Sequence, residues 1–189
     1  DLFYSWRSDR DLLAGYRYRL GETSATSTST DHSFYVGLVG RIVSKLSGNA
    51  RLGWSHRINN YPAPIPDKTN DGVYASLSAT WPVSQKITFT LTGTQDFSTT
   101  STNFETESTT VDLSGRFSHT VKFSTRANLG AGHTRYISGF SGATNTLTPG
   151  FNGQDRSDTY VTAGVGADYS VNEHLNISLN YAYFRNDSN

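Results

Sequence analysis

The chain has 189 residues, with 16 Lys and Arg against 16 Asp and Glu, and it contains no Cys and no Met. The absence of Cys excludes disulfide bonds and thiolate metal sites, and zero net charge argues against a nucleic-acid binder. No run approaches the roughly 18 apolar residues that indicate a transmembrane helix. Hydrophobic residues make up only 35% of the chain, aromatic residues make up 13%, and Ser and Thr contribute 24 each. This composition favours strands over helices.

A period of two residues runs along most of the chain. In residues 86–97, for example, Ile87, Phe89 and Leu91 share one face, and threonines occupy the other. Such alternation indicates strands with one apolar face. Most of these strands exceed the 5–6 residues that are usual in globular proteins and suit a tilted membrane-spanning strand of roughly 9–11 residues. In chain order, we predict strands near 2–6, 10–22, 33–43, 46–58, 72–83, 86–98, 104–118, 121–137, 157–171 and 174–186.

The connections between these strands alternate in length. Short turns fall at 8–9, 44–45, 84–85, 118–120 and 172–173, and long polar segments fall at 23–32, 59–71, 99–103 and 138–156. Short turns on one side and long loops on the other are typical of outer-membrane barrels. We therefore predict an all-β fold: an antiparallel up-and-down transmembrane β-barrel, with residues 1–189 as a single domain or an internal segment of one. The alternative is a soluble β-sandwich, whose strands are shorter.

The apolar face of each strand is predicted to meet lipid. Aromatic residues gather near the strand ends of this face, where a barrel places its interfacial girdles. The residues concerned are Trp54, Trp81, Phe97, Phe117, Tyr169 and Tyr183.

The polar face is predicted to line the lumen, and it carries most of the charge found within strands. Four acidic residues fall on it, namely Asp11, Asp96, Asp112 and Asp168. Against these stand eight basic residues that we predict to set selectivity: Arg17, Arg19, Arg41, Arg51, Arg57, Arg116, Lys122 and Arg126. An excess of Lys and Arg biases a pore towards anions. The alternative is that these arginines pair with aspartates across strands and fill the interior, as in small barrels.

The two chain ends suggest a segment of a larger barrel. With the short turns in the periplasm, the first and last predicted strands would leave both termini outside, whereas single-chain bacterial barrels have an even strand number and both termini in the periplasm. We therefore expect at least one further strand on each side and a barrel of at least twelve strands, or completion of the sheet by copies of the same chain. The missing initiator Met and signal peptide also indicate a mature chain or a fragment.

Three segments carry a family resemblance: KLSGNARLGWSHR, DGVYASLSATWPVSQKITFTLTGTQDFS and DTYVTAGVGADYSVNEHLNISLNYAYFRNDSN. They resemble the putative outer-membrane β-barrel porin type 2 family. The resemblance implies passive passage or secretion through the outer membrane of a Gram-negative bacterium, and related proteins are associated with exopolysaccharide export. It supplies no catalytic residues.

Motifs for chemistry are weak. The five histidines do not form a zinc-ligand pair, and no nucleophile elbow of the G-x-S-x-G type is present. Asp67, Asn70 and Asp71 could hold Ca²⁺, although such residues more often make turns. We therefore expect no enzyme activity, no cofactor and no metal; a hydrolase on the barrel wall would need a Ser and a His bonded to each other.

Two functions stay open. The first is a channel for small anionic solutes or for polysaccharide. The second is a non-conducting scaffold or surface-binding barrel that acts through loops 59–71 and 138–156. The expected partners are outer-membrane lipid and an anionic solute or polysaccharide; other barrel subunits or envelope proteins stay open, and no nucleic acid is expected.

Overall fold

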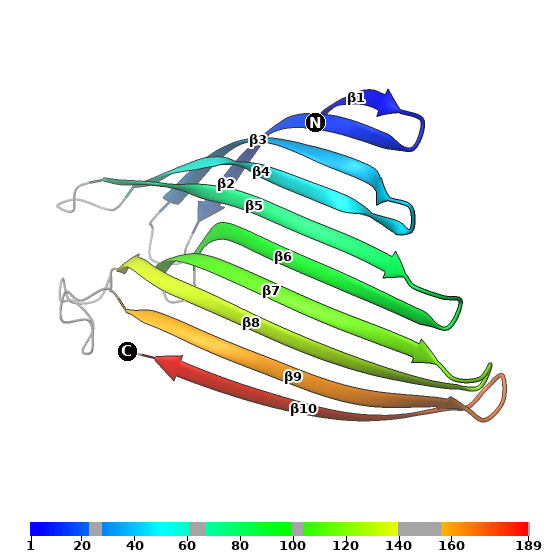
Figure 1. The fold of residues 1–189 in the computed structure, drawn as a ribbon. Coiled ribbons are helices and arrows are strands. Elements are labelled where there is room, and N and C mark those ends of the chain that lie inside the picture. Colours follow the sequence, from blue (N-terminus) through cyan, green and yellow to red (C-terminus); the bar gives the residue numbers. More distant parts are fainter. Residues whose placement is uncertain (23–27, 61–66, 100–103, 140–155, 189) are drawn as a thin grey trace.

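The described part of the chain is a single layer of ten strands. A computed structural model describes residues 1–22, 28–60, 67–99, 104–139 and 156–188 (Figure 1). The strands are β1 (Leu2–Arg7), β2 (Arg10–Glu22), β3 (Thr28–Val43), β4 (Leu46–Asn60), β5 (Lys68–Pro82), β6 (Ile87–Thr99), β7 (Phe104–Ser118), β8 (Phe123–Gly139), β9 (Ser157–Ser170) and β10 (Asn176–Ser188). The described part of the chain has no helix that is long and apolar enough to cross a membrane.

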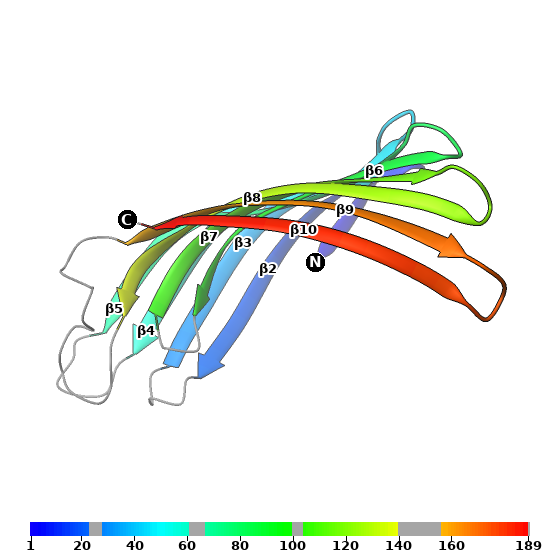
Figure 2. The same ribbon diagram turned by 90° about the horizontal axis from the view of Figure 1, so that it is seen from below.

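Every strand pairs with its neighbours in the sequence, in the order β1 to β10, and every pairing described is antiparallel. The short turns lie along one edge of the sheet, which we call the turn end; the long connections leave from the opposite edge, the loop end (Figure 1). This up-and-down order confirms the predicted fold class. The two edge strands, β1 and β10, are not joined to each other, and the sheet is strongly curved (Figure 2).

Two strands begin earlier than their composition indicates. β3 begins at Thr28 and β5 at Lys68, so Asp31, His32 and Asp71 lie in strands and not in loops. Their surroundings are rich in Ser, Thr and Asn, which resembles loop composition. Pairing with neighbouring strands extends these segments, because Asp31 faces an arginine on each side. Lys122, in contrast, precedes β8 and lies in a turn, not in the predicted strand.

The two faces of the sheet differ in chemistry. Large apolar side chains stand exposed on one face along β2–β10, which we call the outer face; they include Val36, Leu52, Leu129 and Leu179. The described strands form one sheet and not the two packed sheets of the β-sandwich alternative. The other face is polar. It is the concave one, because side chains from β2 and β6, four strands apart, meet on it. We call it the inner face.

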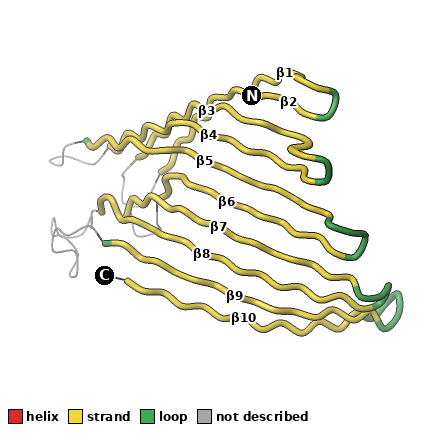
Figure 3. The backbone as a smooth tube through the Cα atoms, viewed as in Figure 1, coloured by secondary structure: helices red, strands yellow, loops and turns green. Residues whose placement is uncertain are grey.

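One irregularity divides the sheet at its loop end. β5 pairs with β6 only over Ala75–Pro82, whereas β5 continues to pair with β4 as far as Lys68. Beyond Gln95, β6 pairs with β7 alone. The loop ends of β5 and β6 therefore diverge, as the backbone trace shows (Figure 3).

Candidate functional site

The inner face carries seven of the eight basic residues that the sequence predicts for the lumen. They come from β2 (Arg17 and Arg19), β3 (Arg41), β4 (Arg51 and Arg57), β7 (Arg116) and β8 (Arg126). The eighth, Lys122, extends from the turn before β8, and its ammonium donates to the carbonyl of Val171 at 3.3 Å. The structure separates the seven into three groups with different surroundings.

A buried ion cluster forms at the loop end of β2–β4. Asp31 on β3 lies directly between Arg19 on β2 and Arg57 on β4. Arg57 donates to both carboxylate oxygens, with its Nη2 2.8 Å from Oδ2, and the Arg19 guanidinium donates to Oδ2 at 2.6 Å. Asp31 is only 1% exposed and Arg57 only 2%. Burying such charges is tolerated when they are paired and hydrogen-bonded, as they are here.

The next row towards the turn end extends this cluster. Ser33 and Ser55 are fully buried and share a hydrogen bond of 2.9 Å between their hydroxyls, and Arg17 donates to Ser33 at 3.3 Å. The Arg17 guanidinium also lies over the ring of Tyr74, 4.6 Å from its centroid. That distance is within the range of a cation–π contact. The inner face of β2–β5 is therefore a packed layer at this level.

The loop end of β6 completes the cluster from across the concave face. Asp96 accepts from Arg17 at 2.8 Å and lies 3.5 Å from Arg19. Arg19 also donates to the carbonyl of Phe97 at 2.6 Å, and Arg57 donates to the carbonyl of Ser98 at 2.9 Å. In a flat sheet, strands four apart would be separated by about 19 Å. These contacts therefore require both the curl of the sheet and the departure of β6 from β5.

The position of Phe97 shows on which side of β5 the loop end of β6 lies. The sequence pattern places Phe97 on the lipid face, and this prediction is wrong, because the side chain is only 2% exposed. A Cβ added at Gly72, which lies on the inner face of β5, would be 2.5 Å from Phe97 Cζ. The outward-pointing side chain of β6 thus packs against the inward side of β5. The end of β6 lies inside the curl of the sheet.

The inner face of β7–β10 is open by comparison. Arg116 on β7 stands directly opposite Arg126 on β8, and both are exposed. Arg126 contacts Asp168 at 3.3 Å and Asn180 at 2.7 Å. Among the described residues, Arg116 makes no ion pair. Like charges directly opposite each other repel, and Asp168 offsets only the charge of Arg126.

The remaining basic residues have acidic neighbours nearer the turn end. Arg51 lies 3.4 Å from Asp1, and Arg41 lies 3.9 Å from Asp9. In the turn that holds Asp9, a hydrogen bond from Arg10 lowers the pKa of the Asp9 carboxyl. Six of the eight predicted lumen residues therefore have a carboxylate partner, as in the alternative in which arginines and aspartates pair.

The charge count of the inner face also needs correction. The predicted count of acidic residues on this face leaves out two. Asp31 falls in a predicted loop, and Asp158 lies near the end of a strand. Among strand residues whose side chains are described, this face carries seven basic and six acidic residues. The acidic residues are Asp11, Asp31, Asp96, Asp112, Asp158 and Asp168. The predicted excess of four positive charges falls to one, so any preference for anions depends on where the charges lie.

Of the six aromatic residues predicted for the lipid interface, all but Phe97 lie on the exposed outer face. Trp81, Phe117 and Tyr169 lie towards the turn end, whereas Trp54 and Tyr183 lie towards the loop end. Near the turn end, the rings of Trp81, Phe89 and Phe117 form a row with centroid separations of 6.4 and 5.9 Å. Their interfacial role stays a prediction.

Within the described part of the chain, four of the five histidines bond through their rings to residues other than serine. Tyr16 lies 2.7 Å from His32, and Asp71 lies 2.6 Å from His56. His119 and His133 contact threonines at 2.8 and 2.9 Å. No group of three or more His, Cys, Asp or Glu residues that could hold a metal ion occurs among the described residues; the Ca²⁺ site at Asp67, Asn70 and Asp71 stays a prediction.

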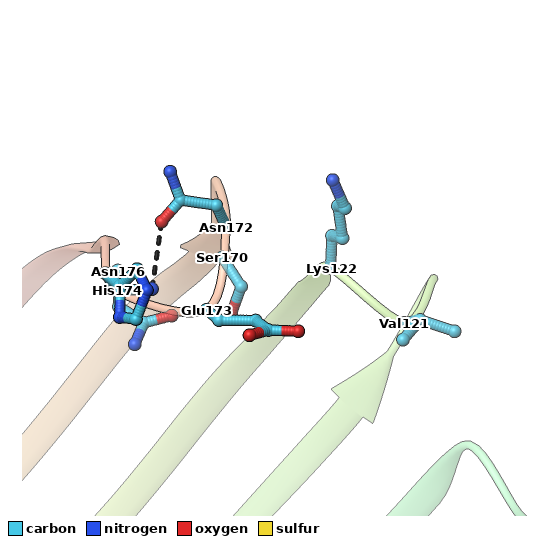
Figure 4. A pocket seen from close by; sticks show the side chains of 7 residues that line it. All are labelled: Val121, Lys122, Ser170, Asn172, Glu173, His174 and Asn176. Atoms are coloured by element: carbon cyan, nitrogen blue, oxygen red, sulfur yellow. Dashed lines mark hydrogen bonds between the residues drawn. The ribbon is translucent and has the colours of Figure 1, made fainter.

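A shallow pocket at the turn end has no ion cluster like the one around Asp31. It lies between the turn before β8 and the turn after β9, and its lining residues are Val121, Lys122, Ser170, Asn172, Glu173, His174 and Asn176 (Figure 4). Asn172 accepts from the backbone N–H groups of His174 and Leu175, both at 2.9 Å, which shapes the turn. Lys122 and Glu173 point in different directions (Figure 4).

Comparison with known proteins supplies a family. A family model described as putative beta-barrel porin 2 matches residues 15–189. Among solved structures, the chain is similar to one described as "CymD monoaromatic hydrocarbon channel", with 11% sequence identity, a TM-score of 0.40, and coverage of 97% of this chain and 77% of that chain. No curated protein matches the sequence.

Proposed function

Because the chain belongs to the family described as putative beta-barrel porin 2, we propose that it forms the wall of an outer-membrane channel. The channel passes small hydrophilic solutes passively and has a weak preference for anions. The observation that carries this proposal is the segregation of the two faces. Apolar side chains stand exposed on the outer face of β2–β10, and charged and hydroxyl side chains occupy the inner face. An apolar surface of this extent would be a liability in water, whereas lipid covers it in a barrel.

The anion preference is supported by the open half of the inner face. Arg116 and Arg126 face each other across β7 and β8, and Asp168 offsets only one of them. Basic side chains on a pore wall favour anions. Small anions are favoured over an acidic polysaccharide chain, because the end of β6 occupies part of the interior on the side of β2–β5.

A second candidate is a barrel that does not conduct. The packed layer around Asp31 favours it, since fully buried polar side chains on an inner face resemble the filled interior of a small barrel. Such a barrel would bind partners through loops 59–71 and 138–156, of which residues 61–66 and 140–155 lie outside the described residues.

Planar-bilayer recording of the full-length protein in a KCl gradient separates the two candidates. We expect stable conductance steps and a reversal potential displaced towards that of chloride. Arg116→Gln should move the reversal potential towards zero, and Arg185→Gln on the outer face of β10 is the matched control that should not. Absence of conductance would favour the non-conducting barrel, and a cation preference would contradict the selectivity proposed for the inner face.

A further inference from the structure

We infer that the loop end of β6, Asp96–Ser98, is the constriction of this channel, held across the interior by Arg17, Arg19 and Arg57. The inference deepens the proposed function and rests on it, since a constriction has meaning only in a barrel that conducts. Its basis is a set of contacts that no local sequence pattern requires.

The first step is that the position of this segment is fixed from several strands at once. Arg17 and Arg19 reach it from β2, and Arg57 reaches it from β4. Two of these three hydrogen bonds are made to backbone carbonyls, at Phe97 and Ser98. The arginines therefore hold the path of the main chain, and bonds from charged donors are stronger than neutral ones.

The second step is that the segment shields part of the inner face. Ser55, on the inner face of β4 beneath the cluster, is fully buried, whereas Ser114, on the inner face of β7, is exposed. Both are serines within long strands of one sheet. Gly72, the register partner of Ser55 on β5, lies against the ring of Phe97. The segment therefore adds to the cover over this level of the inner face, and a solute moving along that face can reach Ser114 but not Ser55.

The third step concerns charge. The cluster contains three arginines and two aspartates, and the aspartates orient the guanidinium groups towards β6. These arginines are consequently engaged in holding the constriction and are not free to attract anions. Loss of the Asp96 carboxylate would loosen the segment, which then keeps only the hydrogen bonds from Arg19 and Arg57 to its carbonyls, and would leave Arg17 without its ionic partner. Conductance and anion preference should then rise together.

The first experiment compares two charge-removing variants of the full-length protein in planar bilayers. Asp96→Asn removes a carboxylate from the cluster. Asp112→Asn, the matched control, removes one from the inner face of β7, where it makes no ion pair among the described residues. We expect Asp96→Asn to raise single-channel conductance by about twofold and to increase anion preference, and Asp112→Asn to change preference alone. Equal conductance in the two variants would overturn the inference.

The second experiment does not depend on conduction. The chain contains no cysteine, so Ser55→Cys and Ser114→Cys each give a single thiol for a bulky, water-soluble maleimide. We expect Ser55→Cys to react at least about tenfold more slowly than Ser114→Cys in the folded protein, because reaction requires local opening. Adding Asp96→Asn should remove most of the difference.

The two experiments distinguish the possible failures. If the wild-type protein does not conduct but Ser55→Cys is protected, the proposed channel fails while the position of β6 stands. If Ser55→Cys and Ser114→Cys react at the same rate in the native background, β6 does not shield the inner face and the inference fails. That comparison leaves every charged residue of the ion cluster in place, so it stays decisive even if Asp96→Asn does not fold.

Discussion

Placing an arginine on the outer face should destabilise the protein far more than placing one on the inner face of the same strand. On β8 the outer face is free of charge from Phe123 to Ala131. Eight residue steps at about 3.4 Å give about 27 Å along the strand, and a tilt of about 40° reduces this to about 21 Å across the membrane. The apolar band of such barrels is about 25 Å tall. Ala127 lies midway along this stretch and is exposed.

We therefore expect Ala127→Arg to cost about 2–4 kcal/mol of folding free energy, the range for a cation near the bilayer midplane. Asn128→Arg is the matched control: its side chain is also exposed but points to the inner face, and we expect it to cost less than about 1 kcal/mol. The assay is reversible denaturant titration of the full-length protein in thin bilayers, followed by tryptophan fluorescence. Equal costs for the two variants would refute the assignment of the faces.

Other substitutions test the packing of the sheet. Arg57→Met leaves Asp31 buried with one arginine partner fewer and should lower the free energy of unfolding by about 3–5 kcal/mol in the same titration. A loss below about 1 kcal/mol would show that water reaches the ion cluster. Gly53→Ala places a Cβ 2.0 Å from the carbonyl oxygen of Phe34, so overpacking should cost about 1–3 kcal/mol. Gly93→Ala meets nothing closer than 3.6 Å and should change stability by less than about 1 kcal/mol; a reversed order for the two glycines would contradict the register of β3 and β4.

The alternation of apolar and polar residues was sufficient to predict the ten strands, their order and their two faces. Each strand is long enough for the period of two residues to be unambiguous, as in Ile87–Phe89–Leu91, and short turns leave antiparallel neighbours as the simplest pairing. The same pattern misjudged strand starts at Thr28 and Lys68, because polar strand ends that extend beyond an apolar band have the composition of loops.

The ion cluster could not be predicted in the same way. Asp96 and Arg17 are 79 residues apart, and their contact depends on where β6 leaves β5. Phe97 continues the outward pattern of its strand, yet it is buried because the strand end passes beneath Gly72. A period of two residues reports which face of the local strand a side chain occupies. It does not report that the strand itself has moved inside the sheet.

A cysteine scan of β8 from residue 124 to residue 132 in the full-length protein tests the central claim most directly. Each variant would be reconstituted into bilayers, labelled with a fluorophore, and tested with a quencher carried in the lipid and with one dissolved in water. If the outer face meets lipid and the inner face lines an aqueous path, odd-numbered positions such as Ala127 will respond to the lipid quencher and even-numbered positions such as Asn128 to the aqueous one. A scan without alternation, or with all positions open to water, would contradict a transmembrane barrel wall.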